Sequence, residues 1–432
     1  MSFIPHDQDD RRRMLETIGI QDEDELFSSI PQDLLLTQRL KIPGPLDEEN
    51  IRRIPQGQFS HVCFAGGGIY RHHIPALVDA LADRQEFSTS YTPYQPEISQ
   101  GVLQSIFEFQ SMMAAITGMY VSNASLYDGA TALAEAALMA IRAKPIKRVL
   151  VTRATNPRFR SVLRTYLANT GVTLQEIPFD MASGQVERFS LERLSGEDAA
   201  LFVQNPNFFG ILEPMDCIAK FARQTAFWGI VVSEAISLGL LKKPGDYNPD
   251  CVVGEAQSFG NPPNAGGPLL GFLCTTKEHV RRMPGRVVGL TKDSRGRDAF
   301  CLTLATREQH IRREKATSNI CTNENLCAIR AALYLAAVGP RGLRTVATQC
   351  VAGAHQILQL IQQVGRQPVF KGPFFHEFVV QLDADKRKAL EDDGIIPGVP
   401  IEYYYPEIKD GLLVAVTEMN TREDWKCLLE NL

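Results

Sequence analysis

The chain has 432 residues, more than one ordinary hydrophobic core organises, so we expect about two or three domains. Its 44% hydrophobic and 22% charged residues are typical of a soluble globular protein. The formal net charge is -5, and the basic runs, Arg11–Arg13 and Arg312–Arg313, are short. These values exclude the strongly basic class of nucleic-acid-binding proteins, and we expect neither nucleic acid nor a membrane surface as a partner.

The N-terminus and the cysteines bear on the compartment. The opening MSFIPHDQDDRRR is acidic where a secretion signal needs a basic start and an apolar run. The nine cysteines include no CxxC pair, and adjacent histidines such as His72 and His73 point to different faces. We therefore expect a cytoplasmic protein with reduced thiols and no metal site.

Residues 1–60 are predicted to form an N-terminal helical segment and a connector. RRRMLETIGI ends at a glycine, and DEDELFSSI begins at acidic capping residues and stops before Pro31. These two signals predict a helical hairpin over residues 9–30. The stretch 43–60 is rich in proline, glycine and charge, which is typical of a connector.

Residues 61–310 are predicted to form a large α/β domain. After a Gly-rich turn come a helix, a proline-stiffened loop at 91–101 and a second helix that ends at Gly118. Apolar strands then alternate with helices, which predicts βαβ units around a largely parallel sheet. The expected strands are 119–125, 148–152, 173–178, 199–206, 227–234, 251–256 and 271–276, and the expected helices are 130–143, 157–171, 190–195 and 215–226.

Residues 311–432 are predicted to form a helical linker and a small C-terminal α+β domain. Helical periodicity begins at residue 307 and covers three stretches, 307–317, 323–339 and 341–365. Strands are expected at 374–383 and 411–417, and helices at 384–394 and 422–432.

Two loops before the alternating region are candidate ligand sites. AGGGIY (65–70) could cradle a phosphate, but it lacks the GxGxxG and GK[ST] spacings, so close packing or a tight turn is favoured. YTPYQPE sets Tyr91, Tyr94 and Glu97 three residues apart on a stiff loop. These side chains could line a pocket, or the tyrosines could pack on the surface, and the sequence does not separate the two.

A third candidate lies before the Ala-rich helix. VSNASLYDGAT places Asn123, Ser125 and Tyr127 between a strand and a helix start, where an open α/β sheet often binds anions. Ordinary helix capping explains Asp128 equally well. The sequence contains no GxSxG, HExxH or other nucleophile–base motif, so the residues alone indicate only an α/β protein related to phosphate-bearing cofactors.

Longer strings carry a resemblance to a known family. They are FAGGGIYRHHIPALVDAL, YTPYQPEISQGVLQSIFEFQ, SNASLYDGATALAEA, VQNPNFFGILE, PGRVVGLTKDSRGRDAF and TREQHIRREKATSNICTN. With MLETIGIQDEDELFSSIP near the start, they cover nearly the whole chain. The chain resembles the glycine cleavage system P-protein family, and within it the α subunit of the split bacterial form.

The resemblance implies a fold and an activity. The fold would be that of the pyridoxal-phosphate-dependent transferases of fold type I, with an aminotransferase-like large domain and a small C-terminal domain. The family decarboxylates glycine with pyridoxal phosphate and passes the aminomethyl group to the lipoyl arm of H-protein. An α2β2 heterotetramer with a β subunit is expected.

The resemblance also implies that the covalent cofactor site lies in the partner. The position of the Schiff-base lysine falls near Gln257, and that of the aspartate on the pyridine nitrogen falls on Ser233. Neither residue can do that chemistry, so pyridoxal phosphate would be held covalently by the β subunit. Tyr91, Tyr94 and Glu97 would reach toward the partner's pocket, with Asn123, Ser125 and Tyr127 as second choices. The alternatives are an autonomous fold-type-I enzyme with a displaced lysine such as Lys277, and a non-catalytic regulatory subunit.

Overall fold

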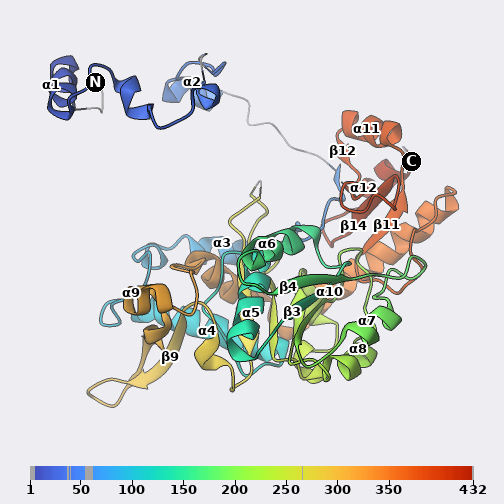
Figure 1. Cartoon of the computed structure of the whole chain (residues 1–432). Coiled ribbons are helices and arrows are strands. Elements are labelled where there is room, and N and C mark those ends of the chain that lie inside the picture. Colours follow the sequence, from blue (N-terminus) through green and yellow to red (C-terminus); the bar gives the residue numbers. More distant parts are fainter. Residues whose placement is uncertain (1–4, 37, 39, 54–61, 265, 431–432) are drawn as a thin grey trace. The chain divides into compact units, whose positions relative to one another are not determined.

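The structure is a computed structural model that describes residues 5–36, 38, 40–53, 62–264 and 266–430 (Figure 1). The chain divides into two units, Met1–Phe59 and Ser60–Leu432. The further division of the second unit at residue 310 stays a prediction.

The first unit contains short helices whose described side chains are not buried. α1 (Gln8–Ile18) ends at Gly19, which adopts φ 86°, as the sequence predicts. The expected second α-helix is instead a 3-10 helix, η1 (Glu23–Phe27), and a further one, η2 (Gln32–Leu34), follows. The expected connector contains α2 (Glu48–Arg53), because Glu48 and Glu49 each pair with an arginine four residues on. Its last part, from residue 54, lies outside the described residues.

The second unit is built on a seven-stranded sheet in the order β2-β8-β7-β6-β5-β3-β4. The five strands from β7 to β4 are parallel, and β8 runs antiparallel to both β7 and β2. The expected mostly parallel sheet is therefore confirmed. The strands are β2 (Val121–Ser122), β3 (Arg148–Thr152), β4 (Thr173–Ile177), β5 (Ala199–Gln204), β6 (Phe227–Val232), β7 (Cys251–Glu255) and β8 (Gly271–Thr275).

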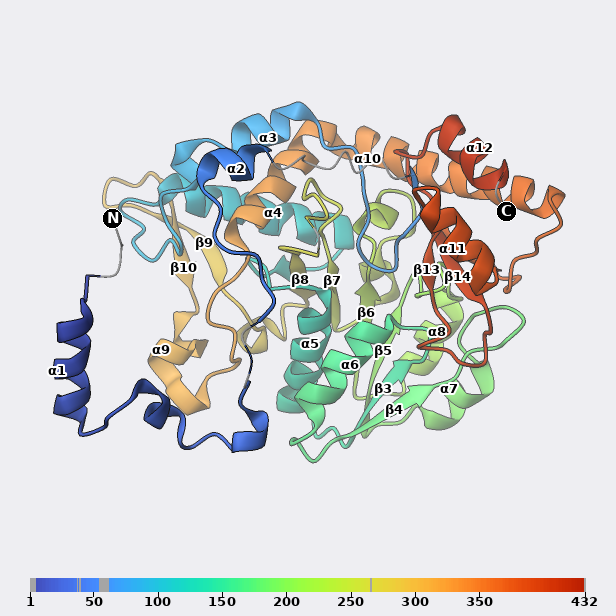
Figure 2. The ribbon, with the colours of Figure 1, turned by 90° about the horizontal axis from the view of Figure 1, so that it is seen from above.

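Helices cover both faces of this sheet, as Figure 2 shows. Side chains of one face pack with α4, α8 and α10, whereas those of the other pack with α5 and α6. Along β5, Leu201 belongs to the first core and Phe202 to the second, as the two-residue period of a strand requires. The helices are α3 (Ala76–Ala82), α4 (Gln100–Thr117), α5 (Gly129–Ala143), α6 (Pro157–Leu167), α7 (Arg188–Leu194) and α8 (Met215–Ala222), with the 3-10 helices η3 (Gln85–Phe87), η4 (Ala235–Gly239) and η5 (Pro244–Tyr247).

Residues 280–317 differ most from the sequence prediction. β9 (Val287–Lys292) and β10 (Asp298–Thr303) form an antiparallel hairpin that we did not predict. The prediction of one helix over 307–317 was wrong. Its α-helical part is limited to α9 (Gln309–Arg312), because Arg313 adopts a positive φ of 53°. The 3-10 helices of this region are η6 (Val280–Arg282), η7 (Ala305–Arg307) and η8 (Arg313–Lys315).

The C-terminal part joins one long helix to a small sheet. α10 (Asn325–Gln363) contains both predicted helices and a kink at Gly339 and Pro340. By length and composition alone it could cross a membrane, but its apolar window is 44% buried inside the protein. The small sheet has the order β11-β14-β13, and β12 pairs with β1 at the start of the unit. The bounds are β1 (Val62–Cys63), β11 (Glu377–Gln381), α11 (Ala384–Asp392), β12 (Ile395–Ile396), β13 (Val399–Pro400), β14 (Gly411–Ala415) and α12 (Arg422–Glu430).

Candidate functional site

The positions singled out by the sequence meet at the edge of the sheet where β6 and β7 end, which we call the carboxyl edge. Ser233 directly follows β6, and Gln257 lies two residues beyond β7. β6 and β7 are neighbouring parallel strands, with Val232 opposite Gly254. In open α/β sheets ligands bind outside the carboxyl ends of strands, so this edge is the place to look for cofactor chemistry.

Gln257 is a buried structural amide. The residue is only 1% exposed to solvent. Oε1 accepts from the backbone N–H of Tyr70 at 3.0 Å, and Nε2 donates to the carbonyls of Tyr70, at 3.1 Å, and Asn261. The two bonds to Tyr70 tie the loop after β7 to the Gly-rich loop, residues 65–70, and the bond to Asn261 closes the loop on itself. An amide cannot form a Schiff base. Both N–H groups of Nε2 are already used, and Oε1 has only one lone pair left to accept a bond from a ligand.

Ser233 also bonds to another side chain of the protein. Its hydroxyl accepts from Nε2 of Gln204 at 2.8 Å, and the residue is 5% exposed. The neighbouring carboxylate, Glu234, does not replace it at this place, because its oxygens bond to Ser258 and to the backbone N–H of Ile236. A neutral hydroxyl cannot hold a pyridinium proton as an ionised carboxylate can.

The start of α5 binds a carboxylate of the chain itself. Oε2 of Glu255 accepts from the N–H of Gly129 at 2.9 Å, while Oε1 accepts from Leu270 and Gln257. Burial raises the pKa of Glu255 to about 7, although these three backbone donors favour the ionised form. Asp128 caps the N–H of Thr131, as expected. These amides, which could have met an anionic ligand, therefore have internal partners.

The Gly-rich loop is packed closely against the protein. A Cβ at Gly66 would overlap the carboxylate of Glu377 and the side chain of Ala415. The N–H of Gly67 donates to Oε1 of Glu377 at 2.8 Å, and its carbonyl accepts from Asn156 at 2.9 Å. Asn156 follows β3, next to the point where the chain order of the sheet reverses between β3 and β5. The glycines thus serve close backbone packing, the reading that the sequence favoured.

The loop at 91–97, which we call the rim loop, presents its side chains to the surface. Tyr91 is 83% exposed, Tyr94 is 51% exposed, and Glu97 is also exposed. Tyr94 is anchored at its hydroxyl, which accepts from Nη2 of Arg286 at 2.7 Å. Arg286 is 4% exposed and also donates to Thr92 of the same loop. The rim loop is therefore held by Arg286 at Thr92 and Tyr94, while Tyr91 and Glu97 are open to solvent.

Asn123, Ser125 and Tyr127 bond to segments other than the rim loop. Asn123 and Ser125 are fully buried and bond to other parts of the chain: Asn123 accepts from the N–H of Leu273, and Ser125 accepts from Asn323 at 2.8 Å. The hydroxyl of Tyr127 accepts from the N–H of Cys321 at 3.4 Å.

Arg286 connects the rim loop to these residues. Its Nη1 donates to Oδ1 of Asn323 at 3.2 Å, and its Nη2 donates to the carbonyl of Cys321. The rim loop is thereby brought into one hydrogen-bonded network with Ser125 and Tyr127, but not with Asn123. Sequence reasoning missed Arg286 and Asn323 because no spacing marks them, although both lie in or beside strings that carry the family resemblance.

Lys277, the displaced lysine of the alternative hypothesis, lies beyond the end of β7 and β8 opposite to Gln257. β8 runs antiparallel to β7, so that Gly271 faces Glu255 and Thr275 faces Cys251. Gln257 continues beyond one end of this pair, and the exposed Lys277 continues beyond the other. With about 3.4 Å per residue, the two ends are roughly 13 Å apart.

The residues present do not fit covalently bound pyridoxal phosphate. Gln257 and Ser233, where the resemblance places the lysine and the aspartate, bond within the protein, and Glu255 accepts from the first N–H of α5. The Gly-rich loop is bonded across the same edge. Gln257 and Ser233 can hold the neighbouring loops in place, but Gln257 offers no amine for a Schiff base and Ser233 no carboxylate for the pyridine nitrogen. The roles of the rim loop and of Asn123, Ser125 and Tyr127 stay predictions.

Comparisons with known proteins identify relatives that match end to end. A model of the glycine cleavage system P-protein family matches residues 1–432. The probable glycine dehydrogenase (decarboxylating) subunit 1 of Moorella thermoacetica is 47% identical, over 99% of this chain and 98% of its own length. The protein of the same name from Desulfitobacterium hafniense is 45% identical, over 98% of this chain and 97% of its own.

Solved structures agree with these relatives. The crystal structure of a glycine decarboxylase (P-protein) of the glycine cleavage system, in inhibitor-bound form, is 42% identical with a TM-score of 0.83 and covers 100% of both chains. An aspartate aminotransferase from Thermus thermophilus, 14% identical with a TM-score of 0.58, covers 85% of this chain and 97% of its own and shows the fold alone. A sphingosine-1-phosphate lyase of Burkholderia pseudomallei, 13% identical with a TM-score of 0.64, covers 92% of each chain. The expected pyridoxal-phosphate fold type I is thereby confirmed.

Proposed function

The chain belongs to the glycine cleavage system P-protein family, and we propose that it is the α subunit (subunit 1) of a glycine dehydrogenase (decarboxylating) whose covalent cofactor site lies in a partner β subunit. The support is the end-to-end likeness to proteins named as subunit 1. Together the subunits would release CO2 from glycine and pass the aminomethyl group to the lipoyl arm of H-protein.

The observation that supports this proposal is the set of hydrogen bonds made by the side chain of Gln257. Its amide is buried and joined to Tyr70 and Asn261, so the loop after β7 has a structural side chain where the fold's lysine would stand. Pyridoxal phosphate would serve as the electron sink of the decarboxylation when bound in the partner. No step of that reaction is assigned to a residue of this chain.

The contribution of this chain would be to complete the partner's active site. The rim loop suits this role because its prolines restrict the backbone and Arg286 fixes Tyr94, so little conformational entropy is lost on assembly. Tyr91 and Glu97 are exposed and can contact a second subunit. Ser125 and Tyr127 would support the loop through Asn323 and Cys321, which bond to Arg286. Asn123 instead bonds to Pro284 and Leu273. We propose an α2β2 assembly, in which each rim loop faces a β subunit.

The first experiment is reconstitution. The purified chain, the β subunit of the same system, pyridoxal phosphate and lipoylated H-protein are combined, and glycine-dependent CO2 release is measured. The mixture should be active, whereas the chain alone should be colourless and release no CO2. Full activity of the chain alone would refute the proposal. A partner whose rate is the same with and without this chain, despite binding it, would favour a non-catalytic regulatory subunit.

A second experiment examines the rim loop in the assembled enzyme. Tyr91→Ala should lower kcat/KM for glycine by on the order of tenfold to a hundredfold, because a misplaced wall loosens the substrate. Tyr403→Ala is the matched control, since Tyr403 is 84% exposed but lies in the C-terminal part. Equal effects of the two substitutions would contradict the role of the rim loop.

The alternative of an autonomous enzyme with a displaced lysine can be tested directly. Borohydride reduction of the chain with pyridoxal phosphate, followed by peptide mapping, should label no lysine stoichiometrically. Labelling of Lys277 would favour the alternative, although this lysine lies beyond the opposite end of β7 and β8.

We also propose that the protein works in the cytoplasm. No disulfide joins any of its nine cysteines, all of which lie among the described residues. This number of cysteines without a disulfide is typical of a reducing compartment. Localisation of a tagged chain by cell fractionation tests this.

A further inference from the structure

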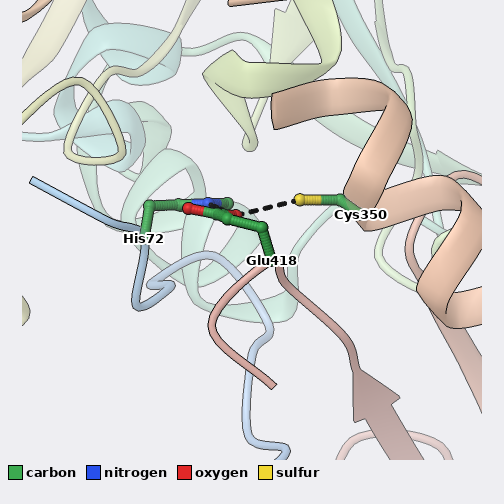
Figure 3. Close-up of side chains that lie close together, drawn as sticks. All are labelled: His72, Cys350 and Glu418. Atoms are coloured by element: carbon green, nitrogen blue, oxygen red, sulfur yellow. Dashed lines mark hydrogen bonds and ion pairs between the residues drawn. The ribbon is translucent and has the colours of Figure 1, made fainter. Parts of the chain in front are cut away.

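A buried cluster outside the carboxyl edge combines three side chains of metal-ligand type. Nδ1 of His72 lies 2.8 Å from Oε2 of Glu418, and Sγ of Cys350 lies 3.2 Å from the same oxygen (Figure 3). The three ligand atoms are all within 4.8 Å of one another. We propose that His72, Cys350 and Glu418 form a zinc site that joins three distant parts of the chain.

The three residues converge only in the tertiary structure. His72 follows the Gly-rich loop, Cys350 lies in the second half of α10, and Glu418 follows β14. This is why the sequence, in which they show no ligand spacing, predicted no metal site. A second contact orients Glu418, because its Oε1 accepts from the N–H of His73 at 2.7 Å.

The surroundings of His72 match those of metal-bound histidines. A ligating histidine usually gives its other ring nitrogen to a carboxylate, which sets the tautomer and the ring orientation. Nε2 of His72 lies 3.5 Å from Oε2 of Glu234, and both side chains are 2% exposed. Glu234 is itself held by Ser258 and by the N–H of Ile236. With Nε2 directed to Glu234, Nδ1 faces Glu418, on the side where Cys350 also contacts that carboxylate.

Two further buried groups support the presence of a ligand. Among the residues that the structure describes, Oη of Tyr334 and Nε2 of His376 have no hydrogen-bond partner. Nε2 of His376 lies 4.0 Å from Oε2 of Glu234, the carboxylate that also faces His72. Buried polar atoms without partners are rare and costly in native proteins.

The geometry and the ligand types favour zinc. Zn–N and Zn–O bonds of about 2.0 Å and Zn–S bonds of about 2.3 Å place tetrahedral ligand atoms roughly 3.3–3.6 Å apart. The 2.8 Å and 3.2 Å contacts therefore need to open by only about half an ångström. One thiolate, one imidazole and one carboxylate suit zinc better than magnesium or calcium, which prefer oxygen ligands alone. The alternative is a bare network in which the thiol of Cys350 donates to Glu418 without an ion.

The site would act as a structural clamp. It lies where the segment after the Gly-rich loop meets α10 and the end of β14 (Figure 3). An ion there would hold that segment, and with it the loop that crosses the carboxyl edge, against the C-terminal part of the chain.

The test uses the full-length chain. After removal of metals by dialysis against a chelator, Zn2+ is titrated by calorimetry, and Co2+ is used as a spectroscopic probe. We expect about one ion per chain, a thiolate-to-cobalt charge-transfer band, and a higher Tm with zinc. Cys350→Ser and Glu418→Gln should weaken binding by tenfold or more. Cys217→Ser, on α8, is the matched control and should bind like the wild type.

Several outcomes would overturn the proposal. Sub-stoichiometric zinc binding by the wild-type chain, or a cobalt complex without a thiolate band, would leave the bare network as the correct description. Unchanged affinity of Cys350→Ser would do the same. If a variant does not fold, as judged by circular dichroism, X-ray absorption of the zinc-loaded wild type decides, because the first shell must contain one sulfur atom.

Discussion

Replacing Gln257 with leucine tests whether the loop after β7 is held by its amide. The substitution keeps the side-chain volume but removes one acceptor and two donors. It leaves the N–H and carbonyl of Tyr70 and the carbonyl of Asn261 without their side-chain partner in a buried region. Each unpaired buried group costs about 1–3 kcal/mol, and the apolar side chain recovers part of this. We expect the free energy of unfolding to fall by roughly 3–5 kcal/mol.

The assay is urea unfolding followed by circular dichroism, with midpoint and slope compared between variant and wild type. Gln359→Leu is the matched control: Gln359 is exposed on α10, so the change should stay within about 0.5 kcal/mol. A loss below about 1 kcal/mol for Gln257→Leu would refute the reasoning, because it would mean that the buried bonds of Gln257 are not made or are replaced by water.

Three further predictions follow from the same contacts. Gly66→Ala should cost about 1–3 kcal/mol in the urea assay, because its Cβ would overlap Glu377 and Ala415; Gly44→Ala, which meets nothing within 4 Å, is the control, and equal costs would contradict the packing role. Burial raises the pKa of Glu377 from 4.5 to about 8, so the folded chain keeps a proton that the unfolded chain releases. Its contribution is complete below the ordinary carboxyl pKa, and the unfolding free energy falls by up to ~1.4 kcal/mol per pH unit as pH rises toward 8; Glu377→Gln should remove that slope, and an unchanged pH profile would count against it. Gln257→Lys should give no borohydride-stable adduct with pyridoxal phosphate, since Ser233 and Glu255 still do not fit the cofactor; a labelled peptide containing position 257 would contradict this.

Most of the large sheet could be predicted from the sequence, because its signals are local. Apolar strands bounded by turn residues, and helices that stop at Gly19 and Gly118, act through neighbouring residues and survive in the structure. The hairpin β9–β10 was missed, because its strands pack against α4 and do not show the apolar pattern of the central strands. The helix expected at 307–317 failed at Arg313, whose positive φ depends on its tertiary setting.

The candidate site was only partly predictable. The family resemblance placed the lysine and aspartate positions at Gln257 and Ser233 and pointed to the rim loop, and these roles stay predictions. The anchor Arg286 could not, since its partners Thr92 and Asn323 are remote in the sequence. The pKa of Glu255, raised to about 7, likewise depends on burial that no local pattern reveals.

The sequence by itself determined the α/β class and the order of most elements, because these depend on residue identity and on short-range periodicity. Only the tertiary structure decided which partners the buried polar side chains bond to. Gln257 bonds to a loop almost two hundred residues earlier, Glu255 takes the first amide of α5, and His72, Cys350 and Glu418 meet from three segments. Hydrogen bonds, burial and metal-ligand geometry depend on distances in space, and these are set when the whole chain folds.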